Sequence, residues 1–294
     1  MAIMDLFWQL FLAVLLGLVE GFTEFLPISS TGHLILLESM LCFEDKNHAF
    51  KVMIQFGAIL AVVVIYFSHL LNIALAAPQN ENARRFVIGI IIAFLPAAAI
   101  GALLGSYIKE VLFNPLVVAT SLIVGGIAIL VIERIIKIPQ YYAVEDFPIS
   151  LYIKIGLVQC IAFIPGVSRS GATIMGSLLM RVERGAATEF SFFLAIPTML
   201  GAFSYDLYKN YKVFDTSDVM TIGIGFAVAF VTAYFVVSRA IAFVRANGFW
   251  PFAWYRIALG SLMLGAILYT QDIKLKDQCA PAPTAKPAPI VPAQ

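Results

Sequence analysis

Two carboxylates spaced one helical turn apart mark the first part of the chain that could do chemistry. Glu20 and Glu24 lie in an otherwise apolar stretch, and a four-residue spacing places both on one face of a helix. No basic residue is near them in the sequence. The pair therefore predicts a divalent cation, Mg²⁺ or Ca²⁺, which takes oxygen ligands and helps to hold phosphates. The alternative is a proton held by one of the two carboxylates.

Three hydroxyl residues follow Pro27, where a new helix would begin: Ser29, Ser30 and Thr31. Hydroxyls at this position commonly cap a helix. The free N–H groups and the helix dipole also make such a place an anion site, so we expect phosphate to bind here. His33 follows Ser30 by three residues, so their side chains could meet across one turn.

A second hydroxyl-rich break contains the sequence Ser168-Arg169-Ser170-Gly171-Ala172-Thr173. Arg169 lies inside an apolar stretch, whereas we assign the other basic residues to loops, span ends or the C-terminal tail. Its fork of donors matches phosphate oxygens, and the neighbouring hydroxyls of Ser168, Ser170 and Thr173 would add to the site. An ion pair with Glu20 or Glu24 is the alternative, and it could precede substrate binding.

The composition indicates an all-α integral membrane protein. Of 294 residues, 61% are hydrophobic and 13% are charged, whereas about a quarter of the residues in soluble domains are charged. Nineteen basic and eighteen acidic residues nearly balance, so we expect no nucleic-acid partner. The three cysteines are far apart and predict neither a disulfide framework nor a zinc site.

Six stretches are long and apolar enough to be transmembrane helices. We place them near 52–71, 86–105, 115–134, 189–208, 219–238 and 252–269. Two further stretches, 6–37 and 151–180, are each interrupted by Pro, Gly and Ser, with halves too short to cross. We expect these to be re-entrant helical hairpins, whose irregular backbone must be shielded from lipid.

The two halves of the chain are related by a shift of 139 residues. Gly17-Leu18-Val19-Glu20 recurs as Gly156-Leu157-Val158-Gln159, and the same shift relates Ser29 to Ser168. Each half then has one re-entrant hairpin and three spans, and an odd number of spans predicts an inverted-topology repeat. The repeats are 1–135 and 136–270, and the Pro/Ala-rich tail 271–294 is expected to be disordered.

The distribution of basic residues predicts the orientation. One set, which includes Arg84, Arg134, Arg184 and Arg256, outnumbers the basic residues of the opposite side, so its side is expected to be cytoplasmic. The termini and the mouth of the first hairpin would then lie outside. Trp250, Trp254 and Tyr255 are expected to form part of an interfacial aromatic belt.

These features support two classes of function. One is a phosphatase that acts on a lipid phosphate, and the other is a transporter, since broken helices in inverted repeats are common in transporters. Transport alone requires neither a Ser-His pair nor paired carboxylates, so the residues favour chemistry.

The sequence also resembles a known family. Glu20-Gly-Phe-Thr-Glu-Phe-Leu-Pro-Ile-Ser-Ser-Thr-Gly-His33 and Pro165-Gly-Val-Ser-Arg-Ser-Gly-Ala-Thr173 are similar to the two signature motifs of the bacterial undecaprenyl-diphosphate phosphatases, also known as bacitracin-resistance proteins. The segment 188–197 resembles a third family stretch. The resemblance covers about residues 10–269.

The resemblance implies an enzyme of the bacterial inner membrane that converts undecaprenyl diphosphate to undecaprenyl phosphate and so recycles the carrier lipid of peptidoglycan synthesis. It also implies six spans with two re-entrant hairpins, a site open to the periplasm, a homodimer and a divalent cation. A flippase of lipid phosphates remains the alternative. The residues that match the family motifs are Glu20, Glu24, Ser30, His33, Ser168, Arg169, Ser170 and Thr173.

A mechanism follows as a hypothesis. Ser30 would be the nucleophile, with His33 as its general base, and a phosphoseryl intermediate would then be hydrolysed. Arg169 and the surrounding hydroxyls would hold the phosphate, and a cation on Glu20 and Glu24 would neutralise further charge. His33 as the nucleophile and direct attack by metal-bound water are the two rival schemes.

Overall fold

The computed structural model describes residues 2–41, 49–210 and 219–270, and the regular secondary structure in these ranges is helical. The expected disorder of the tail 271–294 lies outside the described residues. The helices are α1 (Ala2–Thr23), α2 (Ser30–Leu41), α3 (Ala49–Ile65), α4 (Phe67–Ala76), α5 (Glu81–Leu112), α6 (Pro115–Ile135), η1 (Val144–Asp146), α7 (Ile149–Gln159), η2 (Cys160–Phe163), α8 (Arg169–Leu179), α9 (Arg184–Asn210), α10 (Val219–Asn247) and α11 (Trp250–Thr270).

Within the described ranges, six helices contain a segment long and apolar enough to cross a membrane by themselves. The segments are Leu6–Thr23, Glu81–Gly105, Pro115–Ile135, Arg184–Tyr205, Val219–Asn247 and Trp250–Tyr269. Five of them coincide with predicted spans. Because a helix of this kind exposes apolar side chains on most of its surface, the chain is a multi-pass membrane protein.

The predicted span 52–71 is not a straight helix. It breaks at Tyr66, and α3 and α4 are bent by 66° relative to each other. The bend directs α4 toward η1, where His69 Nε2 lies 3.1 Å from Glu145 Oε1. His69 is in the first turn of α4, and α3 and α4 together remain long and apolar enough to form one broken span.

The first stretch begins with a longer helix than predicted, because α1 has 22 residues and its segment Leu6–Thr23 is by length and composition a candidate span. Gly17 and Gly21 do not interrupt α1, since both serve helix packing. A Cβ atom on Gly21 would lie 2.5 Å from the carbonyl oxygen of Ala229 in α10, so only glycine allows this approach. In the second stretch, α7 and α8 have 11 residues each, as short as expected.

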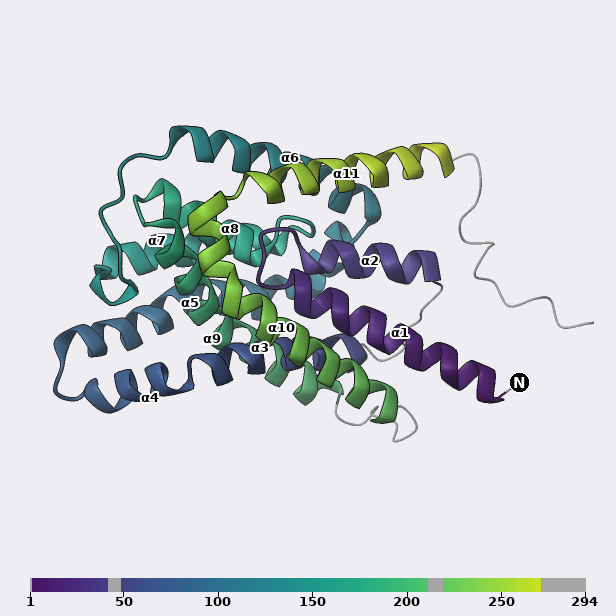
Figure 1. Ribbon diagram of the computed structural model, residues 1–294, viewed down its shortest axis with the longest axis horizontal. Helices are drawn as coiled ribbons and strands as arrows, with labels where there is room; N and C mark the ends of the chain where they lie inside the picture. Colours follow the sequence, from purple (N-terminus) through teal and green to yellow (C-terminus); the bar gives the residue numbers. More distant parts are fainter. Residues whose placement is uncertain (1, 42–48, 211–218, 271–294) are drawn as a thin grey trace, which may run out of the picture.

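The long helices pack in two groups around the short ones (Figure 1). Helix α10 packs closely against α1 and α3, and α6 runs beside α11. The α6–α11 approach also depends on glycine, because a Cβ on Gly126 would lie 2.7 Å from the carbonyl oxygen of Ala253. Helix α8 packs against α7 and α9.

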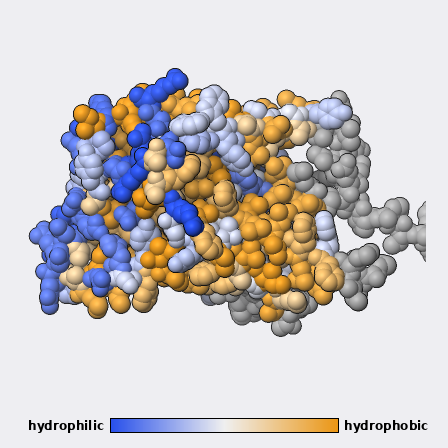
Figure 2. Space-filling model, in the orientation of Figure 1, coloured by the Kyte–Doolittle hydropathy of each residue, from blue (hydrophilic) through white to orange (hydrophobic). Residues whose placement is uncertain are grey.

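Aromatic side chains fix the position of α9 against the preceding segments. Phe147, Tyr152 and Phe190 are buried together, with ring centroids 5.3–5.7 Å apart. Hydrophilic residues gather over one end of the visible face, whereas hydrophobic residues cover much of the rest (Figure 2). The aromatic cluster therefore fixes α9 against α7 and the segment that precedes it.

Candidate active site

Each of two loops, 24–29 and 164–168, ends in a serine with a left-handed backbone conformation. Ser29 has φ 69° and Ser168 has φ 76°, a left-handed conformation that non-glycine residues adopt at a cost. Each serine caps the helix that follows: Ser29 Oγ accepts from the Gly32 amide at 3.4 Å, and Ser168 Oγ accepts from the Gly171 amide at 3.1 Å. The pairs Ser29/Gly32 and Ser168/Gly171 are separated by the 139-residue shift seen in the sequence.

Each serine cap accepts a hydrogen bond from only one of the backbone N–H groups at the start of its helix. The first four N–H groups of a helix have no partner inside the helix, and the positive end of the helix dipole lies there. The start of α2 (Ser30, Thr31) and the start of α8 (Ser168, Arg169) both line one cavity. Two helix N-termini thus contribute to the same pocket, and such termini bind anions.

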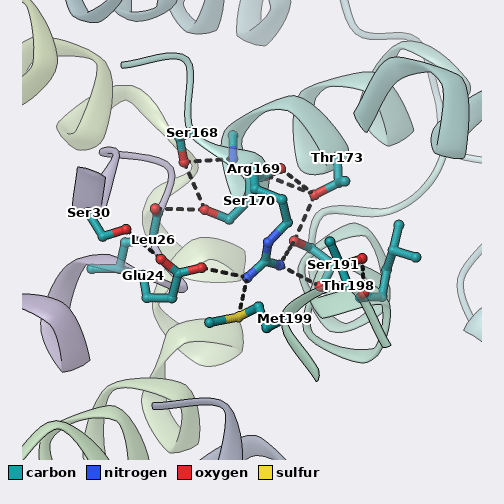
Figure 3. A network of polar contacts seen from close by, with 12 residues as sticks. Glu24, Leu26, Ser30, Ser168, Arg169, Ser170, Thr173, Ser191, Thr198 and Met199 are labelled. Atoms are coloured by element: carbon teal, nitrogen blue, oxygen red, sulfur yellow. Dashed lines mark hydrogen bonds and ion pairs between the residues drawn. The ribbon is translucent and has the colours of Figure 1, made fainter. Parts of the chain in front are cut away.

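Glu24, Ser30 and Arg169 form a connected unit in this pocket (Figure 3). The Ser30 hydroxyl donates to Glu24 Oε2 at 2.5 Å, and Arg169 Nη2 lies 3.0 Å from Glu24 Oε1. The ion pair considered as an alternative role for Arg169 is therefore present, with Glu24 as its partner. A carboxylate, a hydroxyl and a guanidinium brought together in this way can accept a proton, supply an oxygen nucleophile and hold a phosphate.

The orientation of Arg169 is set by α9. Arg169 Nη1 donates to the Ser191 carbonyl oxygen at 2.9 Å and lies 3.4 Å from Ser191 Oγ. Ser191 was not singled out by the sequence analysis, although it lies in the third family-like segment. Its serine side chain in an otherwise aromatic run was the available signal.

The other hydroxyls of the second motif bind the protein itself. Ser170 donates to the Leu26 carbonyl oxygen at 2.8 Å, and its Oγ lies 3.0 Å from Ser168 Oγ. Thr173 Oγ1 lies 2.7 Å from Ser191 Oγ. Both Ser170 and Thr173 are fully buried, and these contacts join the two loops and α9. Their predicted contact with phosphate stays a prediction.

His33 is oriented away from Ser30. Its Nδ1 lies 2.8 Å from the Ser29 carbonyl oxygen, which can only accept, so Nδ1 carries a proton. Its Nε2 lies 2.6 Å from the Tyr255 hydroxyl, with the two rings stacked. The Ser30 hydroxyl donates to Glu24 instead. The expected Ser30–His33 contact is thus replaced, because the ring turns back to the carbonyl four residues earlier.

Glu20 is fully buried, and neither of its carboxylate oxygens has a hydrogen-bond partner in the described structure. The Glu24 amide donates to the Glu20 carbonyl oxygen at 3.0 Å, so the two residues follow one helical turn. A buried carboxylate without a partner is costly when ionised. Its oxygens therefore fit a proton or a hard cation. The described residues contain no cluster of three or more acidic, His or Cys side chains that could hold a metal.

These polar residues form one end of a cavity of about 560 Å³, and the rest of the cavity is largely apolar. Its polar end is lined by Glu24, Ser29, Ser30, Thr31, Ser168 and Arg169. Its apolar walls come from α3, α5, η2 and α9 and include Phe56, Phe94, Ala98, Gly101, Phe163 and Phe203. Glu20, His33, Ser170 and Thr173 do not contribute to the lining. The shape and polarity fit an amphiphile with an anionic head and a hydrocarbon chain.

The structure corrects the placement of Arg256. The sequence analysis counted it among the basic residues of the cytoplasmic side, but it is buried in α11 and only 1% exposed. It donates to backbone carbonyls of both site loops. The sequence feature that could have identified it is the one used for Arg169, namely a basic residue inside an apolar stretch. Tyr255, expected in an aromatic belt, is half-exposed and also contacts His33.

The fold and the site define a class: a multi-pass membrane protein with a pocket that is polar at one end, where two helix N-termini meet, and apolar along its other walls. Residues 13–262 match the family described as bacitracin resistance protein BacA, and the chain belongs to this family.

Curated relatives cover most of the chain. It is 51% identical to undecaprenyl-diphosphatase 1 of Agrobacterium fabrum over 257 residues. The aligned residues make up 87% of this chain and 96% of the relative. The undecaprenyl-diphosphatases of Nitrobacter winogradskyi and of Rhodopseudomonas palustris strain BisB18 are 52% and 53% identical over the same lengths.

Proposed function

We propose that this protein is an undecaprenyl-diphosphate phosphatase, which hydrolyses undecaprenyl diphosphate to undecaprenyl phosphate and inorganic phosphate. It would thereby recycle the carrier lipid of peptidoglycan synthesis and confer bacitracin resistance. Family membership and the names of the relatives support this proposal. The observation that carries it is the Glu24–Ser30–Arg169 unit at the polar end of an apolar cavity.

The geometry favours Glu24 as the general base. The Ser30 oxygen attacks the terminal phosphorus while its proton passes to Glu24, which already accepts its hydrogen bond. The anhydride bond breaks, and undecaprenyl phosphate leaves. Water then attacks the phosphoseryl group and adds its hydroxyl and a proton to the phosphate, the bond to the Ser30 oxygen breaks, and the proton held by Glu24 returns to that oxygen as inorganic phosphate is released. This replaces His33 as the proposed base, because His33 Nδ1 and Nε2 are directed to Ser29 and Tyr255.

Arg169 is proposed to bind the terminal phosphate and stabilise the charge that develops during transfer. Its guanidinium is held by Ser191 and paired with Glu24, so it is oriented before substrate enters. The free amides of α2 and α8, with Ser29, Thr31 and Ser168, would complete the phosphate site.

Glu20 and Glu24 are proposed to hold a divalent cation, Mg²⁺ or Ca²⁺, because Glu20 presents two buried oxygens without partners. When bound, this ion would neutralise phosphate charge.

We further propose that the two halves form an inverted repeat with re-entrant hairpins at 6–37 and 151–180. The matched left-handed serine caps at Ser29 and Ser168 and the short helices α7 and α8 support this arrangement. The protein would lie in the bacterial inner membrane as a homodimer, with the site open to the periplasm.

Phosphate release tests the function directly. Purified protein in detergent would be given undecaprenyl or farnesyl diphosphate, with and without chelator, and compared with Ser30→Ala. Ser238→Ala is the matched control, because the Ser238 hydroxyl bonds only within its own helix. We expect Ser30→Ala to abolish phosphate release and Ser238→Ala to leave it unchanged. Chelator should reduce phosphate release by wild type and by Ser238→Ala. Lipid diphosphate binding without release by folded wild-type protein would favour a carrier.

A further inference from the structure

The guanidinium of Arg256 lies where the two site loops meet α6. It is 1% exposed, and its hydrogen bonds in the described structure all go to backbone carbonyls. The acceptors are Pro27 at 3.0 Å, Gly166 at 2.9 Å, Val167 at 2.9 Å, Ser121 at 3.2 Å and Leu122 at 3.4 Å. One side chain thus joins the first loop, the second loop and α6.

These bonds link loops that are distant in sequence. Arg256 Nη1 alone donates to both Pro27 and Val167. Pro27 lies between Glu24 and Ser30 in the first loop, and Val167 precedes Ser168 and Arg169 in the second. The relative position of the two loops determines whether Ser30 and Arg169 reach the same phosphate.

The bonds also fix peptide orientation. In a trans peptide the carbonyl and the following amide point in opposite directions, and no cis peptide occurs in the described residues. With the Val167 carbonyl bound to Arg256, the Ser168 N–H points away from the guanidinium. Ser168 is the left-handed residue that caps α8, and a backbone in this region persists only when its surroundings hold it.

We propose that Arg256 is a positioning residue that holds the two loops in register and thereby sets the catalytic geometry of Ser30 and Arg169. It does not line the cavity, so it acts through the loops and not on the substrate. The kinetic part of this inference rests on the proposed phosphatase function.

Gly125 of α6 offers a way to displace the guanidinium without removing it. A Cβ on Gly125 would lie 2.0 Å from Arg256 Nη2, and the nearest atoms it meets all belong to Arg256. Alanine favours a helix more than glycine does, so Gly125→Ala acts on the site through Arg256. Gly265→Ala is the matched control, because Gly265 is on α11 and a Cβ there meets nothing within 4 Å.

The experiment compares wild type, Gly125→Ala, Gly265→Ala, Arg256→Lys and Arg256→Met in detergent. A displaced catalytic group commonly costs one to two orders of magnitude, so we expect kcat to fall by about tenfold or more in Gly125→Ala and Arg256→Met. Arg256→Lys should be intermediate, because it keeps the charge but not the fork of donors. KM should stay within about threefold, since the apolar cavity that holds the chain is unchanged.

Hydrogen exchange supplies a readout that does not depend on activity. The amides of Ile28 and Val167 are hydrogen-bonded within the two loops. In Gly125→Ala and Arg256→Met, peptides covering 24–31 and 162–170 should both exchange faster, while α1 and α10 stay protected.

Three results would overturn the inference. The first is that Gly125→Ala and Arg256→Lys both have the same kcat as the control Gly265→Ala. Another is a raised KM with unchanged kcat, which would indicate direct substrate contact. The third is faster exchange across the whole molecule, which would indicate a general stabilising role. Wild-type protein without phosphatase activity would count against the proposed function, and the exchange pattern would still decide whether Arg256 couples the loops.

Discussion

The two carboxylate oxygens of Glu24 bind different partners. One accepts the Ser30 hydroxyl, and the other accepts the Arg169 guanidinium. A base that already binds the proton it must remove needs little reorganisation during the reaction. The same carboxylate keeps Arg169 pointed toward the phosphate position before substrate arrives.

This arrangement predicts different effects for the two candidate bases. Glu24→Gln should lower kcat by about 10²- to 10⁴-fold, the usual contribution of a general base. His33→Asn should lower it much less, because His33 contacts Ser29 and Tyr255 and not Ser30. Steady-state phosphate release measures both. A large loss in His33→Asn with near-normal activity in Glu24→Gln would restore His33 as the base.

Arg169→Lys tests the guanidinium at the same scale. A lysine keeps the charge but cannot bond Glu24 and Ser191 together, so its position over the phosphate is lost. We expect kcat to fall by about 10²-fold, as for loss of one preorganised donor. Phosphate release with saturating farnesyl diphosphate measures this, and wild-type kcat would mean that Arg169 serves only as the ion-pair partner of Glu24.

At the scale of elements, helix starts organise both the site and its support. The starts of α2 and α8 present capped but incompletely bonded amides to the cavity. The start of α9 is held differently, by Glu183. Its Oε2 accepts from the Ala186 amide at 3.0 Å and from Arg245 Nη2 at 3.3 Å. Helix α9 in turn carries Ser191, which orients Arg169.

Glu183 therefore predicts a pH dependence of stability. Burial by itself would raise the pKa of this carboxyl, but the amides of Gly185 and Ala186 and the Arg245 guanidinium outweigh it and lower the pKa below 4.5. A lowered folded-state pKa stabilises the fold above the unfolded pKa, and this stabilisation is lost as pH falls through the folded value. Glu183→Gln should therefore melt below wild type at neutral pH, and the gap should close in acid.

Thermal unfolding in detergent at neutral pH and at pH values below 4.5 measures this gap. Glu110→Gln is a suitable control, since Glu110 is an exposed residue of α5 far from the first turn of that helix. A gap that persists unchanged in acid would contradict the assignment.

At the scale of the whole molecule, the cavity is assembled from helices of both halves. Helices α3 and α5 come from the first half and α9 from the second, so its apolar walls exist only in the folded chain. A hydrocarbon chain that enters from lipid exchanges one apolar environment for another, so these walls act through close packing against the chain and not through its removal from water.

Ala98→Trp would fill part of this apolar space. We expect KM for undecaprenyl diphosphate to rise by about tenfold or more, while kcat for a short-chain diphosphate stays within about threefold, because the polar end is untouched. Leu103→Trp on the exposed face of the same helix is the control. Equal KM values in the two variants would place the isoprenoid chain outside this cavity.

The sequence by itself determined the class of fold and made the candidate site residues visible. Charged residues inside apolar stretches are costly in a membrane, so Glu20, Glu24 and Arg169 were visible as site candidates without any structure. Length and apolarity likewise determined five of the spans, because a helix must satisfy its own backbone in lipid.

Only the tertiary structure decided which groups pair. Sequence spacing placed Ser30 near His33, but the rotation of the His33 ring toward the Ser29 carbonyl and the Tyr255 hydroxyl left Ser30 to Glu24. Arg256 was assigned to the cytoplasmic side on its charge alone, and its partners lie 89 to 229 residues away in the chain. Such contacts depend on how helices pack and where loops end, and local periodicity carries no information about either.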